Sequence, residues 1–93
     1  MYHAEPELKE RIIRLYIQEG RTYQSLSDEY NISRGVISRW VKKYRENAAS
    51  NAKQAKHLAD MERLRKLQNE IEELRKENDF LKKAAAFFAK ESK

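Results

Sequence analysis

Residues 52–90 contain no glycine or proline, and this uninterrupted stretch restricts the possible folds more than any other feature. Alanine, leucine, glutamate, lysine and arginine dominate it, and these are the strongest helix formers. A single helix of this length spans on the order of 55 Å. So long a helix cannot fold back on a small head, so the sequence predicts a compact head, residues 1–46, joined to an extended helical stalk.

Apolar residues of the stalk recur at alternating spacings of three and four residues, which is the a/d pattern of a coiled coil. Leu58 and Met61 continue this stripe upstream, where the step from Met61 to Leu64 breaks strict register like a stammer. A lone helix would leave the stripe in water, so we expect two copies of the chain to pair along it. The predicted dimerisation residues are Leu64, Leu67, Ile71, Leu74, Asn78, Leu81, Ala85 and Phe88.

Charged residues beside the stripe favour a parallel pair. In that arrangement Glu70 meets the partner's Arg75, and Glu77 meets the partner's Lys82. Each exposed pair contributes only about 0.3 kcal/mol, so these pairs select the orientation more than they stabilise it. Asn78 is the stronger indication, because facing asparagines bond each other in a parallel two-stranded register and are buried unpaired in other registers.

A second apolar stripe lies outside the a/d positions, at Phe80, Ala84 and Phe87. Its members are spaced i, i+4 and i+7, so they share one helix face. A dimer does not need this face. We hypothesise that it docks against something beyond the paired helix, either further copies of the chain or a catalytic partner.

The head carries the signals of three short helices. Pro6 suits the first turn of a helix that stops near Gly20. Thr22 is a candidate N-cap for a helix over 23–30, and Ser33 for a helix from Arg34 to about Arg45. Residues 47–57 are interpreted as a hinge, 58–90 as the coiled coil and 91–93 as a tail, because poor helix formers cluster at Asn47, Ser50 and Asn51.

Residues 23–42 match a helix-turn-helix position by position. Asn31 tolerates the positive φ that the tight turn requires, and the small Ser27 lies where the two helices cross. The positions that should point into the shared core are Leu26, Tyr30, Ile32, Ile37 and Trp40.

The third helix has two different faces when it is rotated by about 100° per residue. Ile37, Trp40, Val41 and Tyr44 share the core side, while residues 34–45 carry five cations and no anion, mostly on the other side. That composition is typical of a helix in the major groove of DNA. The predicted DNA-binding residues are Arg34, Gly35, Val36, Ser38, Arg39, Lys42, Lys43 and Arg45.

Different roles are expected along this face. Arg39 is the best candidate for base reading, because a guanidinium bonds a guanine edge with two donors. Arg34 and Ser38 either read bases or hold phosphates, Gly35 permits close approach, and Val36 can meet a thymine methyl group. Contacts to the phosphate backbone are expected from Lys42, Lys43 and Arg45.

Two other interpretations predict no binding to duplex DNA. The aromatic residues could stack on bases of a single strand, although their spacing fits the core better. The stalk could also serve as a structural or adaptor coiled coil, in which case the cations of the third helix only solvate its surface. A gel-shift assay on Arg39→Ala separates these alternatives from binding to duplex DNA.

Composition excludes several classes of site. The chain has no cysteine, and His3 and His57 are isolated from each other, whereas zinc sites usually need three or four convergent ligands. No apolar run approaches the roughly 20 residues that cross a bilayer, and no signal-peptide core follows Met1. We therefore expect a cytoplasmic protein with no metal, no cofactor and no membrane partner.

Three segments together resemble a known family. They are residues 20–26 (GRTYQSL), 33–44 (SRGVISRWVKKY) and especially 77–90 (ENDFLKKAAAFFAK). These segments resemble the OrfA protein of a large class of bacterial insertion sequences, and the likeness covers nearly the whole chain.

The resemblance implies a role in transposition. OrfA-type proteins bind the terminal inverted repeats of their element through the helix-turn-helix, and unextended they are associated with regulation of transposition. A programmed ribosomal frameshift extends the same sequence into the full transposase, whose downstream Asp-Asp-Glu domain holds two metal ions and performs strand transfer. The resemblance therefore implies a bacterial, nucleoid-associated protein that is not itself an enzyme.

The expected function is sequence-specific binding of double-stranded DNA and multimerisation within an insertion-sequence transposition system. The expected partners are the terminal inverted repeats, a second or further copy of the chain through the coiled coil, and the full-length transposase. A stand-alone dimeric transcriptional repressor is the alternative, because the same head and zipper would serve it.

Overall fold

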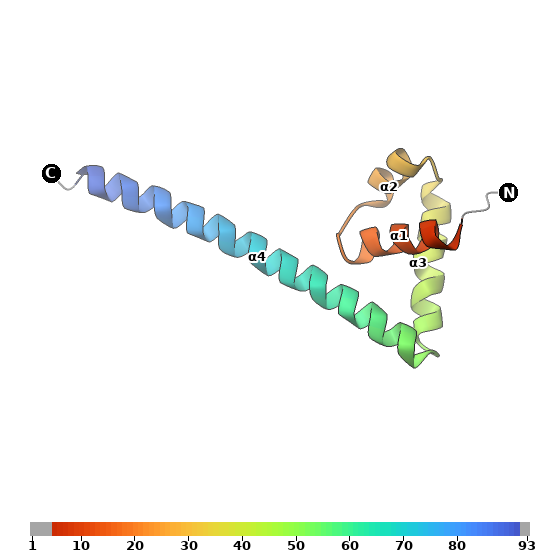
Figure 1. Ribbon diagram of the computed structural model, residues 1–93. Helices are drawn as coiled ribbons and strands as arrows, with labels where there is room; N and C mark the ends of the chain where they lie inside the picture. Colours follow the sequence, from red (N-terminus) through yellow and green to blue (C-terminus); the bar gives the residue numbers. More distant parts are fainter. Residues whose placement is uncertain (1–4, 92–93) are drawn as a thin grey trace.

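The computed structural model describes residues 5–91, and this part of the chain consists of helices and short connections without a strand. His3 and the tail residues 92–93 lie outside the described range. A head of three short helices continues into one long helix that forms a straight rod (Figure 1). The helices are α1 (Pro6–Ile17), α2 (Tyr23–Tyr30), α3 (Arg34–Ala48) and α4 (Ala52–Glu91). The expected all-α architecture, a helix-turn-helix head with a long helix, is confirmed.

The rod makes the molecule strongly elongated. Its principal extents are 70 × 32 × 17 Å and its radius of gyration is 19.6 Å. A compact domain of this length would have a radius of gyration of about 12 Å. The 40 residues of α4 account for the difference, because they span about 60 Å.

Local signals in the head form as expected. The Thr22 hydroxyl accepts a hydrogen bond from the Ser25 amide (3.0 Å), and the Ser33 hydroxyl accepts one from the Gly35 amide (3.2 Å). Both caps satisfy amides that have no partner within their own helix. Asn31 adopts the left-handed conformation at φ 56°, so it makes the tight turn between α2 and α3.

The connection between α3 and α4 is short. Helix α3 runs three residues beyond Arg45, and the buried side chain of Ala48 (5% exposed) stabilises this last turn. Asn51 caps α4, because its side-chain oxygen accepts a hydrogen bond from the Gln54 amide (3.1 Å). Only residues 49–51 therefore separate two helices, within the range expected to be a hinge.

Two apolar clusters hold the head together, and α3 contributes to both. Ile37 joins one cluster with residues of α1, α2 and the turn: Ile12, Leu26 and Ile32. Val41 joins the other with residues of α1 and α4: Ile13, Ile17 and Met61. These eight side chains are 0–7% exposed. Helix α3 is therefore the central element of the head.

The first turns of α4 pack back onto the head, contrary to the expectation that the whole helix would stand clear of it. Met61 is 2% exposed in the second cluster, and Leu58 is half-buried against it. The Arg65 guanidinium donates a hydrogen bond to the Glu19 carbonyl oxygen (3.2 Å). Leu58 and Met61 were expected to extend the stalk stripe, but in the structure they belong to the head core.

Replacement of each of the two glycines by alanine should change the free energy of unfolding in opposite directions. Gly20 has φ +72°, and a Cβ there would overlap the Arg65 guanidinium, whereas a Cβ at Gly35 meets only the Ser33 hydroxyl at 3.6 Å. We expect Gly20→Ala to lower the free energy of unfolding by about 1–2 kcal/mol. Gly35→Ala should raise the free energy of unfolding by about 0.5 kcal/mol, because alanine favours the helix.

Urea denaturation followed by the fluorescence of Trp40, the single tryptophan, measures both changes. An undiminished stability of Gly20→Ala would show that neither the left-handed backbone nor the Arg65 contact matters at Gly20.

Candidate nucleic-acid interface

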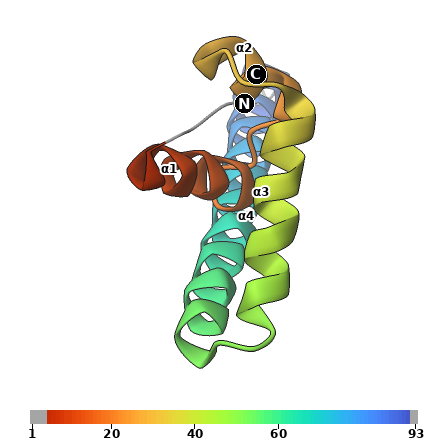
Figure 2. The ribbon, with the colours of Figure 1, turned by 90° about the vertical axis from the view of Figure 1, so that its right-hand side faces the viewer.

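The outward face of α3 is uncovered along its first three turns. Because Ile37 and Val41 are 0% and 2% exposed, residues about half a turn away from them face solvent. In Figure 2, α3 lies at the edge of the head, with α1 and α4 on the same side of it. The exposed residues of the predicted DNA-binding set are Arg34, Gly35, Arg39, Lys42, Lys43 and Arg45, and the half-buried ones are Val36 and Ser38.

The cations of this face form no ion pair with a carboxylate in the described part of the chain. Among residues 5–91, the ion pairs form at Arg21 and at Lys76, and none of them involves a cation of α3. The nearest anion on α3 is Glu46, which follows the last predicted binding residue. An uncovered basic surface of this kind attracts phosphates by Coulomb force and by release of counterions.

One flank of the face adjoins α2. Tyr23, Ser38, Lys42 and Arg45 line a shallow groove there. The Tyr23 ring stacks on Tyr16, with centroids 4.2 Å apart and planes 4° from parallel. Burial raises the pKa of Tyr23 and the Tyr16 hydroxyl raises it further, while Ser38 and Arg45 act in the opposite direction. Tyr23 therefore keeps a protonated hydroxyl beside two residues of the predicted set.

The opposite flank adjoins α1. Lys9, Trp40, Lys43 and Asn47 line a second shallow groove. The Lys9 ammonium lies 5.4 Å from the centroid of the Trp40 ring, a distance typical of a cation–π contact. Lys9 and Lys43 therefore place two positive charges on this flank, about 100° around α3 from Lys42, and Glu10 of α1 lines the same groove.

Sequence reasoning missed Lys9 and Tyr23 as members of this surface. Lys9 belongs to α1, and Tyr23 is one of the aromatic residues whose spacing fits the core. Neither residue therefore belonged to the stretch of sequence that predicts DNA binding. Amphipathic analysis of α3 finds the residues on α3 itself, but it cannot tell which neighbouring side chains border them. Only the packing of the three head helices brings Lys9 and Tyr23 to the two flanks.

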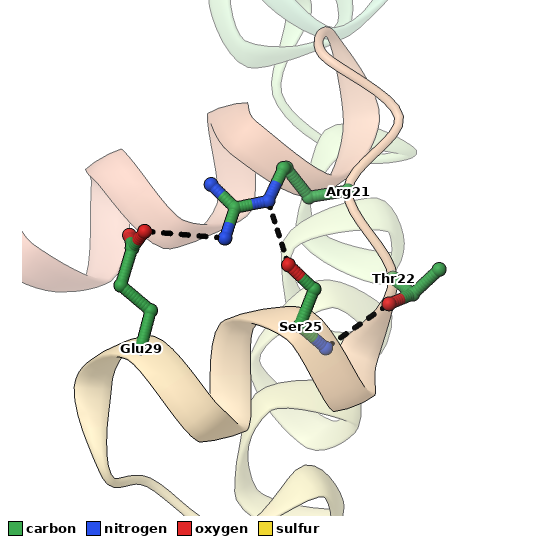
Figure 3. Close-up of polar contacts among 4 residues, drawn as sticks. All are labelled: Arg21, Thr22, Ser25 and Glu29. Atoms are coloured by element: carbon green, nitrogen blue, oxygen red, sulfur yellow. Dashed lines mark hydrogen bonds and ion pairs between the residues drawn. The ribbon is translucent and has the colours of Figure 1, made fainter.

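Arg21 is a cation of the head with a structural role (Figure 3). Its Nε donates to the Ser25 hydroxyl (2.8 Å), and its Nη2 lies 3.3 Å from Glu29 Oε1 in an ion pair. Both contacts fasten the loop before α2 to the surface of that helix. Because its charge is already paired, Arg21 provides a natural reference for the unpaired cations of α3.

Five aromatic residues of the described head helices pack within the head. Tyr16, Tyr23, Tyr30 and Trp40 pack against the first apolar cluster, and Tyr44 against the second. The Tyr44 hydroxyl is buried and has no hydrogen-bond partner among residues 5–91. Its burial, followed by the charge of Glu10, raises the pKa of Tyr44. These rings act as core residues, which agrees with their helical spacing and disfavours a platform for single-strand bases.

Residues 5–91 contain neither a metal-ligand cluster nor a membrane-spanning helix. That range holds no group of three or more histidine, aspartate or glutamate side chains that could share a metal ion. His57 lies edge-on to Tyr44, with ring centroids 6.5 Å apart. None of the described helices is both long and apolar enough to cross a membrane.

The predicted pairing stripe of α4 lies open in the single chain. Its large apolar members are 43–66% exposed: Leu64, Leu67, Ile71, Leu74, Leu81 and Phe88. Asn78 and Ala85 on the same stripe are also exposed. Phe80 and Phe87 outside the stripe are 70% and 60% exposed. An apolar surface of this extent on one helix is typical of an interaction site.

Comparison with known proteins supports the family expectation. A family model described as "Transposase" (HTH_Tnp_1) matches residues 5–79. "Putative transposase YkgN" of Escherichia coli (strain K12) is 29% identical over 79 residues, which cover 85% of this chain and 68% of that protein. No solved structure matches the chain significantly. The residues matched by the family model include all three head helices and most of α4.

Proposed function

The chain belongs to the transposase helix-turn-helix family HTH_Tnp_1, and on this premise we propose that it is the DNA-binding and multimerising component of an insertion-sequence transposition system. The observation that carries the proposal is the outward face of α3, which is cationic, uncovered and without an ion pair to any carboxylate of residues 5–91. In helix-turn-helix proteins the second helix of the motif lies in the major groove, and α3 occupies that position.

Residues near the start of α3 read the bases. Arg39 is exposed one turn after Gly35, so its guanidinium can reach the O6 and N7 atoms of a guanine. Gly35 carries no side chain between the helix and the floor of the groove. Arg34 and Ser38 flank this centre, and Val36 can contact a thymine methyl group. Glu46 lines the same groove as Lys42 and Arg45 and would repel phosphates, so the base contacts lie nearer the start of α3.

The flanks of α3 hold the two phosphate backbones. A helix in a major groove about 12 Å wide has one strand on each side. Lys42 and Arg45 face one strand with the Tyr23 hydroxyl beside them, and Lys43 faces the other strand together with Lys9. Phosphate contacts on both sides set the register of Arg39 on the bases.

The stripe on α4 pairs two chains in parallel. Six large apolar side chains on one helix face are 43% exposed or more, and a second copy of the same face would cover them. The charges of Glu70 and Glu77 and the single Asn78 favour the parallel two-stranded form. The exposed Phe80 and Phe87 are available for higher oligomers or for the full-length transposase.

The proposed DNA sites are the terminal inverted repeats of the element, and binding there also regulates transposition. The similarity to a protein named as a transposase supports these sites more than a stand-alone repressor at one operator. Selection of duplexes from a random pool, followed by mapping of the winners, separates the two functions. Winners at both ends of an element support the proposal, whereas winners at a single promoter operator would favour the repressor.

We expect Arg39→Ala to weaken binding to the selected duplex by about 10- to 100-fold, because a lost bidentate guanine contact is worth about 1–3 kcal/mol. Lys43→Gln should weaken binding to all duplexes and reduce the slope of log affinity against log salt by about 1. Fluorescence anisotropy over a series of salt concentrations measures both effects.

Arg21→Ala is the matched control, because it removes an arginine of the same head whose charge is paired with Glu29. Its salt slope should equal that of the unmodified chain. If Arg21→Ala weakened binding as much as Arg39→Ala, the assignment of the α3 face would be wrong.

Leu74→Asp should weaken dimerisation at least about 100-fold. Each of the two chains would bury one leucine fewer, which costs about 1.5–3 kcal/mol of dimerisation free energy per side chain. Each would also place a carboxylate in the seam, that is, the contact between the two paired α4 helices. Asn69→Asp is the control, because it adds the same charge to an exposed position outside the stripe. Sedimentation equilibrium gives both dissociation constants, and equal constants would exclude the proposed seam.

A further inference from the structure

Helix α4 uses two different faces along its length. Its first turns face the head through Gln54, Leu58, Met61 and Arg65, which are buried or half-buried. From Leu64 onward the large apolar residues are 43% exposed or more. The change of face coincides with the break in heptad register between Met61 and Leu64. Before this break the apolar residues of α4 pack on the head, and after it they form the exposed face that is proposed to pair with a second α4.

The two faces point in different directions. At 3.6 residues per turn, the head-facing residues and the first seam residues, Leu64 to Leu74, lie about a third of a turn apart. A second α4 can therefore approach along the seam without displacing the head. In a parallel pair with two-fold symmetry, the two heads then lie on opposite sides of the rod.

The joint between head and stalk is held at both ends. At the start of α4, the Gln54 side chain donates to the Tyr44 carbonyl oxygen at 2.9 Å. Eleven residues further, or about 16 Å along the helix, Arg65 donates to the Glu19 carbonyl oxygen at 3.2 Å. Met61 lies between these contacts, 2% exposed against both α1 and α3. Three contacts spread over this length resist both bending and rotation of the stalk.

Gly20 makes the outer contact of the joint possible. A Cβ at this residue would occupy the position of the Arg65 guanidinium, and the glycine also supplies the positive φ of the loop. The loop between α1 and α2 thus presents both a carbonyl acceptor and the space for the arginine. Arg65 reaches across to the loop that directly precedes the helix-turn-helix.

We propose that Met61 and Arg65 are positioning residues that fix the stalk seam relative to α3, so that a pair of chains presents its two α3 helices at one separation and orientation. The proposal rests on the proposed function, in that the paired helices read two DNA half-sites. In symmetric helix-turn-helix dimers, the distance between the recognition helices sets the spacing of the half-sites. The spacing of half-sites that the paired chains prefer is therefore set by Met61 and Arg65, which do not contact DNA themselves.

The geometry of the joint can be measured within one chain. The sequence has no cysteine, so Asp28→Cys on α2 and Asn69→Cys on α4 provide two unique sites for spin labels. Doubly labelled chains diluted with an excess of unlabelled chains report only the distance within a chain. We expect a single narrow distribution of distances by double electron–electron resonance, whether the chain is paired or not.

Arg65→Ala and Met61→Ala should each broaden this distribution, and Arg65→Ala should do so with the head still folded by Trp40 fluorescence. Lys66→Ala is the matched control, because its exposed side chain is next to Arg65 but outside the joint. A broad distribution in the unmodified chain, or unchanged widths in both variants, would overturn the proposal.

A second measurement reports the consequence for DNA. Two copies of the selected half-site are placed at a series of spacings, and the affinity of each chain is compared across the series. The unmodified chain should prefer one spacing by at least 10-fold, while Arg65→Ala should bind several spacings equally. The same preference for one spacing in the unmodified chain and in Arg65→Ala would contradict a positioning role. If the unmodified chain bound no duplex at all, the proposed function would be wrong instead.

Discussion

The burial of one side of α3 is the constraint on which the rest of the structure depends. Ile37 and Val41 lie one turn apart on this helix and belong to two different apolar clusters. The first cluster ties α3 to α1 and α2, and the second ties it to α1 and α4. Because both clusters lie on the same side, the cationic residues of α3 have no other position than the surface. The proposed contact with DNA is thus a consequence of how the core is packed.

Helix α4 links that head to the proposed assembly. Its first turns complete the second cluster through Met61, and the remainder carries apolar residues that one chain cannot bury. An unpaired α4 leaves this stripe in water, so it lacks the favourable free energy that burial against a partner would provide. The same helix therefore belongs to the head at one end and, under the proposed pairing, would be covered by a second copy at the other. The joint in each chain would then decide where its head lies relative to the partner's head.

Much of the fold could be predicted because its signals are local. Thr22, Ser33 and Asn31 act within a few residues of their own position, so helix limits and the tight turn were visible in the sequence. Leu58 and Met61 were assigned incorrectly, because a heptad pattern shows that a stripe is apolar but not what covers it. The flanking residues Lys9 and Tyr23 were missed for a related reason, since only the crossing of α1 and α2 over α3 brings them to the basic face.

The most direct test of the account is an amide NMR titration of the chain with duplex DNA at low ionic strength. Chemical-shift changes should concentrate in residues 34–45 of α3, with smaller changes at Lys9 and Tyr23 on its two flanks. The amides of the stalk beyond the joint should shift little. Changes centred on the stalk, or spread over the head with none on the outward face of α3, would contradict the account.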